Sequence, residues 1–263
     1  MLINLALLTL FIQMKEQRLI TNSATLITRG KRKQIVTAGK IAKQARGIQS
    51  IEAIPSNHQP WYHFYTKGDK QYENYMSKEW SIEKRGNVEL FEKLSLEGAQ
   101  AGLSWRTILK KRDAYRRVFH NFQFDKVSIM NEDDVEKMIS SEETGDNAVV
   151  KHRGKLLSVI NNAKKVKAMV DSNQSFNDFL WSFVDDKPIL NSWKCTSDMP
   201  SKTSESERMS KELKRLGFKF VGPTTCYSLM QSCGMVIDHP AHTDEWRDAH
   251  ERLKARPGGF QKR

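Results

Sequence analysis

The chain has few cysteines, prolines and glycines and no long apolar run, and each shortage excludes a class of protein. Its 263 residues include three cysteines, an odd number that excludes a disulfide-stapled secreted scaffold and indicates a reducing compartment. With 14 glycines and 7 prolines, it is neither collagen-like nor a low-complexity chain. No apolar run reaches the roughly 18 residues of a membrane-spanning helix, so we expect no membrane partner. What remains is a chain long enough to bury a core of its own.

Acidic residues are outnumbered by basic ones, mostly at one end of the chain. The sequence has 43 Lys and Arg against 31 Asp and Glu, a formal net charge of +12, which favours an acidic partner, above all nucleic acid. Residues 1–56 contain nine of the basic residues, two acids, and no Trp or Tyr. Such a composition cannot bury enough apolar surface to fold alone. We therefore predict a disordered basic arm over 1–56.

The role of this arm has three interpretations. The apolar run over 2–12 has the length of a signal-peptide core, but it lacks a basic segment before it and a small-residue cleavage site after it. The hydroxyl-rich, acid-poor stretch after Met14 is typical of a mitochondrial targeting segment. The same composition suits a nuclear or nucleic-acid-binding tail. In the third interpretation the start of the protein is wrongly assigned, and the stretch has neither role. The expected localisation is nuclear or mitochondrial.

Apolar residues of the folded part recur at helical spacing. Leu90, Leu94 and Ala101 share one helix face. Further helices are expected over 156–163, over 176–183 after Ser175, from Ser204 to Leu216 before Gly217, from Pro223 to Gly234, and from Asp244 to Lys254. No strand-like alternation of useful length is present, so the predicted fold class is all-α.

One carboxylate, that of Glu97, interrupts the first apolar face. An ionised carboxylate there is costly unless a cation or several hydrogen-bond donors meet it. It is therefore either a core glutamate satisfied by its surroundings or a pocket acid that faces a cationic or amino-bearing ligand. Small residues at 98, 99, 101 and 102 leave space around it, and Trp105 supplies a flat wall, which favours the pocket.

A run dense in aromatic residues precedes Glu97. It comprises Trp61, Tyr62, Tyr65, Tyr72, Tyr75 and Trp80. Aromatic rings and a carboxylate together hold a planar cation by stacking, cation–π attraction and ion pairing. The alternative is that these rings are ordinary core.

Residues 214–224 join two amphipathic helices through glycines at 217 and 222. Such a hairpin can aim the N–H groups of the second helix at a phosphate, helped by the helix dipole. Lys214, Arg215 and Lys219 add positive charge. The same pattern also occurs in turns that only connect helices.

Taken together, these motifs resemble the DNA-3-methyladenine glycosylase I family, a branch of the helix-hairpin-helix DNA glycosylases. The matching segments, between residues 61 and 239, are Glu79-Trp80, LEGAQAGLSW at 96–105, LKKR at 109–112, HRGK at 152–155, WSFV at 181–184, GFKFVG at 217–222, Cys226-Tyr227-Ser228 and Asp238-His239. The resemblance implies a two-lobed all-α fold with a base pocket between the lobes. It places a catalytic domain over 57–242 and leaves 243–263 as a C-terminal helical extension.

The resemblance also implies the activity and the residues that carry it. A monofunctional enzyme of this family flips N3-methyladenine out of double-stranded DNA and hydrolyses its glycosidic bond, which starts base excision repair; we expect it to act as a monomer. The implied catalytic residues are Glu97, Tyr75 and Trp105. The implied substrate-binding residues are Tyr72, Tyr65, Trp80 and Leu103, of which Leu103 matches the residue thought to wedge into the gap left by the base. The implied DNA-binding residues are Gly217, Lys219, Gly222 and Thr224.

Two further positions bear on the chemistry. Thr224 stands where bifunctional relatives carry a lysine, so no Schiff-base lyase step is expected. Asp238 is the nearby candidate for stabilising a sugar cation, and the alternative is a helix-capping or positioning role. A non-catalytic DNA-binding paralogue is the competing function, against which the retained Glu97, Tyr75 and Trp105 argue.

The resemblance breaks at the family's structural zinc site. The four ligand positions, two Cys and two His in the family, here read His63, Met76, His239 and Thr243. A thioether and a hydroxyl do not complete a tetrahedral zinc site. His63, His239 and His242 would be the residual nitrogen ligands. We expect no cofactor, with the 243–263 extension packing in place of the zinc. At the pocket lip, Tyr65 replaces a Trp and Ser81 a Gly.

Overall fold

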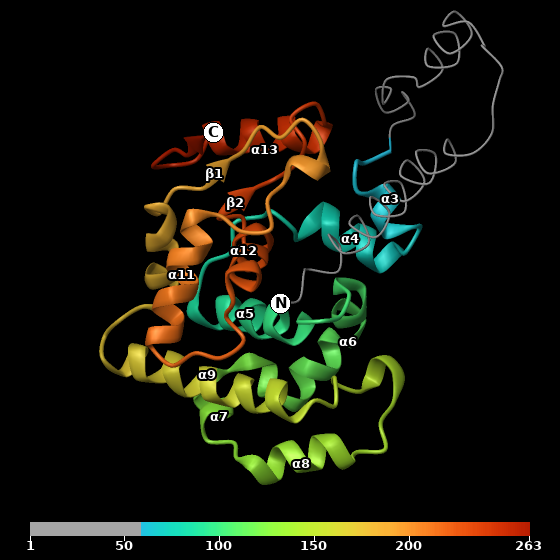
Figure 1. The fold of residues 1–263 in the computed structure, drawn as a ribbon, viewed down its shortest axis with the longest axis vertical. Helices are drawn as coiled ribbons and strands as arrows, with labels where there is room; N and C mark the ends of the chain where they lie inside the picture. The colour runs from blue at the N-terminus through green and yellow to red at the C-terminus, as the bar shows by residue number, and fades with distance from the viewer. Residues whose placement is uncertain (1–58) are drawn as a thin grey trace, which may run out of the picture. The chain divides into compact units, whose positions relative to one another are not determined.

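The computed structural model describes residues 59–263, which are mainly α-helical (Figure 1). The basic arm predicted over 1–56 lies outside the described residues. The helices are α3 (His63–Thr66), α4 (Lys70–Lys78), α5 (Asn87–Gln100), α6 (Trp105–Val118), α7 (Phe124–Ser128), α8 (Glu132–Ser140), α9 (Arg153–Asp171), α10 (Phe176–Trp181), α11 (Ser204–Arg215), α12 (Pro223–Ser232) and α13 (Asp244–Lys254). Short 3₁₀ segments are His120–Phe122, Gly145–Asn147, Ser182–Val184 and Thr196–Asp198. Within 59–263, no helix is long and apolar enough to cross a membrane.

Helix α9 is the centre of one group of helices. It packs against α5, α7 and α8, while α6 packs on α5 and α4. Leu156, Ile160 and Ala163, which the sequence placed on one face of a helix, are all buried. This stripe supplies the apolar surface that holds the group together.

Helices α11 and α12 form a second group and are joined by the hairpin at 216–222 (Figure 1). Pro223 is the first residue of α12, as predicted, because a first-turn proline loses no helical hydrogen bond. Gly217, with φ of 85°, follows the end of α11 and takes the left-handed conformation that glycine adopts freely. Since α12 also packs against α5, helix α5 contacts both groups.

A small parallel sheet, which the sequence did not indicate, adds to this helical fold. Its strands are β1 (Ile189–Leu190), β2 (Val236–Ile237) and β3 (Gln261–Lys262), in the order β2–β1–β3. Ile189 pairs with Val236 on one side and with Gln261 on the other. Strands of two residues are too short to show the alternation by which a strand is recognised.

The C-terminal residues pack on this sheet. Helix α13 spans Asp244–Lys254, the range that the sequence indicated. Its Ala249 and Leu253 form a second small core with Leu190 and Ile237. The last described strand, β3, completes the sheet, so the segment after 243 contributes both a helix and a strand.

Candidate active site

Glu97 lies near the end of α5, where the two groups of helices meet. The residue is 5% exposed. Burial raises the pKa of its carboxyl to about 7, against the opposing effects of the Lys93 charge and a hydrogen bond shared with the Ser232 hydroxyl. Within the described residues, Glu97 has no salt-bridge partner inside 4.0 Å. A buried acid with a pKa this high is poised to gain stabilisation from a cationic ligand.

Two tyrosines of α4 lie near this acid, and the first residue of α6 packs against one of them. The ring centroids of Tyr75 and Trp105 are 5.2 Å apart, and those of Tyr72 and Tyr75 are 6.3 Å apart. Burial and then the charge of Glu97 raise the pKa of Tyr75. Burial raises the pKa of Tyr72 to about 12, with Glu97 adding to the rise. The structure thus brings Glu97 and these three predicted rings together.

Two features of this cluster are characteristic of a binding site. The indole nitrogen of Trp105 is buried and has no hydrogen-bond partner among the described residues. Lys93, which the sequence analysis missed, is 4% exposed. Its Nζ lies 4.9 Å from the Tyr75 ring centroid and 3.7 Å from Glu79. Unsatisfied buried polar atoms are rare in folded proteins, so the Trp105 nitrogen calls for an explanation, and a bound ligand would supply its partner.

Trp80 and Tyr65 belong to a neighbouring aromatic cluster instead. The ring of Trp61 lies 5.8 Å from that of Trp80 and 6.0 Å from that of Tyr65. Trp80 also contacts the His239 ring at 5.1 Å, and the Tyr65 hydroxyl shares a 2.7 Å hydrogen bond with Thr196. Their substrate-binding role stays a prediction.

A tight turn connects the acid on α5 to the tryptophan on α6. Leu103 N–H donates to Gln100 O at 2.6 Å, and Gly102 has φ of 76°. Together with φ −45° and ψ 116° at Ala101, this is a type II turn, which requires positive φ at its third residue. Ser104 then caps α6. Leu103, the predicted wedge, is half-buried on this turn.

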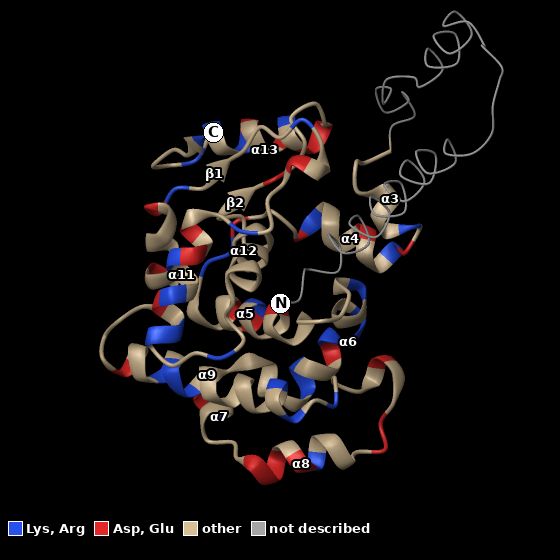
Figure 2. Cartoon of the chain, viewed as in Figure 1, with Lys and Arg blue, Asp and Glu red and all other residues tan. Residues whose placement is uncertain are grey.

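The hairpin between α11 and α12 is held by asparagines of α9 that the sequence analysis also missed. Asn162 Nδ2 donates to Lys219 O at 3.0 Å, and Lys219 N–H donates to Asn162 Oδ1 at 2.8 Å. Asn161 donates to Gly217 O at 2.9 Å. The Lys219 side chain remains exposed. Figure 2 shows further basic residues on α9 and at the end of α11.

The hairpin also approaches α5 closely, through Phe220. A Cβ atom added at Gly98 of α5 would meet Phe220 Cβ at 3.3 Å, so glycine permits the approach. Gly222 is the N-cap of α12, and Thr224 lies in its first turn. Phe220, with φ of 55°, is 37% exposed. The DNA-binding role of the hairpin stays a prediction.

Asp238 is completely buried in a cage of donors. Tyr227 O–H donates to it at 2.6 Å, and the side chains of Gln231, Asn191 and Trp193 each donate at 2.7 Å. These four bonds tie α12 to the segment after β1. An acid so occupied fits the positioning alternative better than stabilisation of a sugar cation.

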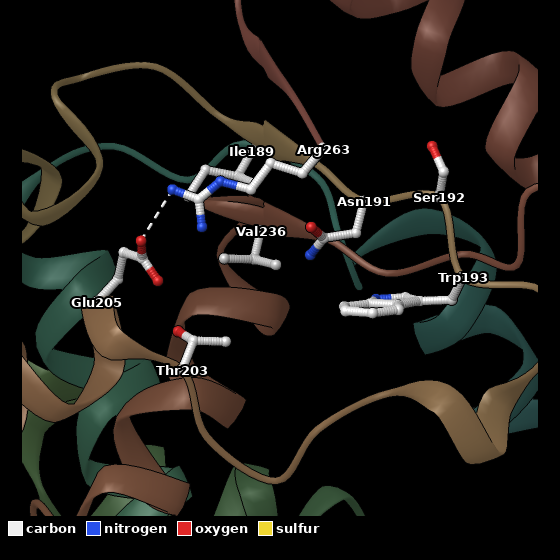
Figure 3. A pocket seen from close by; sticks show the side chains of 8 residues that line it. All are labelled: Ile189, Asn191, Ser192, Trp193, Thr203, Glu205, Val236 and Arg263. Carbon is white, nitrogen blue, oxygen red and sulfur yellow. Dashed lines mark hydrogen bonds and ion pairs between the residues drawn. The ribbon is translucent and has the colours of Figure 1, made fainter.

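A cavity of about 360 Å³ opens beside this cage (Figure 3). Its lining residues are Ile189, Asn191, Ser192, Trp193, Thr203, Glu205, Val236 and Arg263. Arg263 pairs with Glu205 at 2.8 Å across the cavity. Burial raises the pKa of Glu205, but this pair and hydrogen bonds at the start of α11 outweigh it and lower the pKa to about 2. None of the predicted pocket residues lines this cavity.

The four zinc-ligand positions have other partners. His63 Nδ1 lies 3.2 Å from Glu73, and Met76 is buried in the core. His239 Nδ1 accepts from Trp61 Nε1 at 3.0 Å, and burial, then Arg252, lower the pKa of His239 to about 3. Thr243 caps α13.

These residues do not fit a zinc ion. His242 is exposed, and in residues 59–263 no group of three or more His, Cys, Asp or Glu side chains is placed to hold a metal. The loss of the zinc itself stays a prediction.

Ser81, which replaces the family's glycine, has φ of 60° and a buried hydroxyl without a partner in the described part. Glycine tolerates that conformation better than serine does.

Comparison with known proteins decides the family. Residues 65–245 match the family described as methyladenine glycosylase. The chain belongs to this family. It is 45% identical over 171 residues to DNA-3-methyladenine glycosylase 1 of Escherichia coli K12, covering 65% of this chain and 89% of that protein. It is 44% identical over 168 residues to the DNA-3-methyladenine glycosylase of Haemophilus influenzae, covering 64% and 88%.

Solved structures of the family share the fold. A crystal structure of 3-methyladenine DNA glycosylase I is 42% identical, with a TM-score of 0.64, covering 67% of this chain and 94% of that one. The Staphylococcus aureus enzyme, whose structure describes 3-methyladenine recognition, is 33% identical, with a TM-score of 0.64 and coverage of 69% and 94%. These findings confirm the family and the helical fold that the sequence motifs indicated.

Proposed function

We propose that the protein is a monofunctional DNA glycosylase that excises N3-methyladenine from alkylated DNA and so starts base excision repair. The observation that carries this function is the buried Glu97 carboxyl beside the rings of Tyr75 and Trp105, in a chain of the methyladenine glycosylase family. A non-catalytic DNA-binding paralogue would have no use for an acid in an aromatic pocket.

The substrate's own charge sets the chemistry. Methylation at N3 makes the adenine cationic and weakens its glycosidic bond. The base leaves with the electron pair of the C1′–N9 bond and becomes neutral, while water adds to C1′ and releases a proton. The protein therefore need not protonate the base. It must bind the cation, reject neutral adenine and orient the sugar for attack.

Each pocket group has a role in that task. Glu97, when ionised, accepts a hydrogen bond from the cationic base and stabilises its charge. Tyr75 and Trp105 stack on the base, and Tyr72 extends the aromatic surface, because electron-rich ring faces favour a cation over a neutral ring. The charge of Lys93 favours the ionised carboxylate of Glu97.

Two elements next to the end of α5, the turn after it and the hairpin that packs on Gly98, are assigned to the DNA. We assign Leu103 to fill the gap left by the flipped base, and the 217–222 hairpin to hold the phosphate backbone. Exposed Lys219 and the basic residues near the hairpin support this assignment (Figure 2). We propose double-stranded DNA as the substrate, a monomer as the active form, and the arm as either a nuclear DNA-binding tail or a mitochondrial targeting segment. With Thr224 in place of a lysine, we propose no lyase step.

We also propose that this protein works without the family's zinc. Where the zinc would link the two ends of the domain, Trp61 donates to His239 and packs against Trp80. Met76 and Thr243 serve the core and a helix cap instead. Helix α13 adds a second small core on the sheet and strand β3 extends the sheet, and this packing supplies the stability that the metal supplies in its relatives.

Base release tests the proposed function directly. Purified protein is incubated with methylated duplex DNA, and the released bases are separated by chromatography. We expect free 3-methyladenine from the wild-type protein and from Glu89→Gln, a control on α5 whose carboxylate is half-exposed and paired with Lys84. Absence of released 3-methyladenine from the wild-type protein would refute the function.

A further inference from the structure

A lysine of α9 holds the turn that carries Leu103. Lys155 Nζ donates to Ala99 O at 2.9 Å and to Ala101 O at 2.5 Å. The residue is 7% exposed, although lysine is rarely buried. Within 59–263 it has no carboxylate partner inside 4.0 Å, so its charge is directed to these two carbonyls.

The two carbonyls define the geometry of the turn. Ala99 is in the last turn of α5, where carbonyls have no partner inside the helix. Ala101 is the second residue of the type II turn that ends at Leu103. Because one ammonium bonds both oxygens, it links the end of α5 to the turn and ties both to α9. Glycine at 102 allows the positive φ of the turn but does not hold the backbone in it. The hydrogen bonds from Lys155 supply that restraint.

The position of Lys155 suggests a role in opening duplex DNA rather than in binding the flipped base. Glu97 belongs to α5 and Tyr75 to α4, so a helix carries each of these two residues. Leu103, by contrast, is held by the turn, and the turn is held by Lys155. A residue that displaces a base from a duplex meets resistance from the stacked neighbours, and a loose turn would yield to it.

We propose that Lys155 is a positioning residue for excision from duplex DNA, acting through the turn that presents Leu103. This inference rests on the proposed function. It differs from a role in general stability because it predicts a defect confined to duplex substrate. Excision from single-stranded methylated DNA, where no base has to be displaced from a partner strand, does not need the held turn.

The test compares single-turnover excision of 3-methyladenine from duplex and single-stranded methylated DNA. For Lys155→Met, which keeps an unbranched apolar chain out to the ε position and removes the ammonium donor, we expect the duplex rate to fall about 10- to 100-fold, as for an element of the site displaced by about an ångström. The single-strand rate should fall less than about 3-fold. Lys167→Met is the matched control, since that lysine is on the same helix and its ammonium pairs with Asp171 at the surface. Equal losses on both substrates, or no loss beyond the control, would overturn the proposal.

Two further variants keep the test decisive. Leu103→Ala alone tests the proposed wedge, and its duplex defect should not add to that of Lys155→Met in the double variant, because both act through one element. Additive defects would show that Lys155 acts elsewhere. If Lys155→Met does not fold, Lys155→Arg is measured instead. Its longer, planar donor should lower the duplex-to-single-strand ratio by at least about 3-fold, and an unchanged ratio would overturn the proposal.

Discussion

Replacing Glu97 with Gln should make the protein more stable and less active. Folding raises the pKa of Glu97 from an ordinary value of 4.5 to about 7, chiefly by burial. Below pH 4.5 the carboxyl is protonated in both the folded and the unfolded state, so its burial does not lower the free energy of unfolding through ionisation. As the pH rises from 4.5 to 7, the unfolded state loses this proton more readily, and the folded protein loses stability. Above pH 7 the penalty is constant.

The size of the penalty follows from the two pKa values. A rise from 4.5 to about 7 corresponds to roughly 3 kcal/mol of unfolding free energy at pH 8. For a folded unit of this length, that is about 6–12 °C in melting temperature. Glu97→Gln has no such penalty, so its melting temperature should exceed that of the wild type at pH 8 and match it near pH 4. Single-turnover excision should fall about 10- to 1000-fold because the variant lacks one charge-assisted hydrogen bond to the base and holds the base less accurately.

Thermal denaturation at both pH values and single-turnover excision test the two halves of this prediction. Glu89→Gln, with its half-exposed carboxylate, should change neither property much. If Glu97→Gln is no more stable than the wild type at pH 8, Glu97 is satisfied in the folded protein. If it also retains full activity, Glu97 is an ordinary core residue and the pocket interpretation is wrong.

Four other perturbations test separate parts of the account. Deletion of residues 1–56 should preserve excision at low salt and weaken duplex binding as salt rises, with the slope of log K against log salt falling by about 0.9 for each phosphate that the arm neutralises; an unchanged slope would favour targeting. Elemental analysis should find well under one equivalent of zinc, and EDTA should leave melting temperature and activity unchanged; stoichiometric zinc would contradict this and make His63, His239 and His242 the residues to mutate. Asn162→Ala should weaken duplex binding about 10-fold, because the Lys219 backbone loses both its partners; unaltered affinity would separate the hairpin from DNA binding. Ser81→Gly should raise stability by about 1 kcal/mol in denaturant titrations, because it relieves a positive φ; destabilisation would refute that.

Local signals in the sequence were enough to predict most of the helices. Ser175 caps α10 as expected, and Pro223 and Gly217 mark helix ends because their backbone preferences operate within a few residues. Helix α13 covers the predicted Asp244–Lys254. The sheet escaped prediction because two-residue strands owe their existence to partners far along the chain.

The pocket was predictable in part, for a similar reason. Glu97 stands out as a charge on an apolar stripe, and the structure surrounds it with predicted aromatic residues. Lys155 and Asn162 do not stand out, although they are seven residues apart and so share a face of α9. Both are buried and bond backbone atoms of other elements. A polar stripe of this kind is the signal that could have found them, but its partners are visible only in three dimensions.

The pH dependence of kcat/KM tests the central claim, that the ionised Glu97 carboxylate receives the cationic base. This ratio reports groups of the free enzyme, and burial places the pKa of Glu97 at about 7. With methylated duplex DNA, kcat/KM of the wild type should rise about tenfold per pH unit up to that value and level off above it. Glu97→Gln should show a low, flat profile over the same range. A wild-type profile that is flat from pH 5 to 8, or a Glu97→Gln profile that retains the rise, would contradict the account.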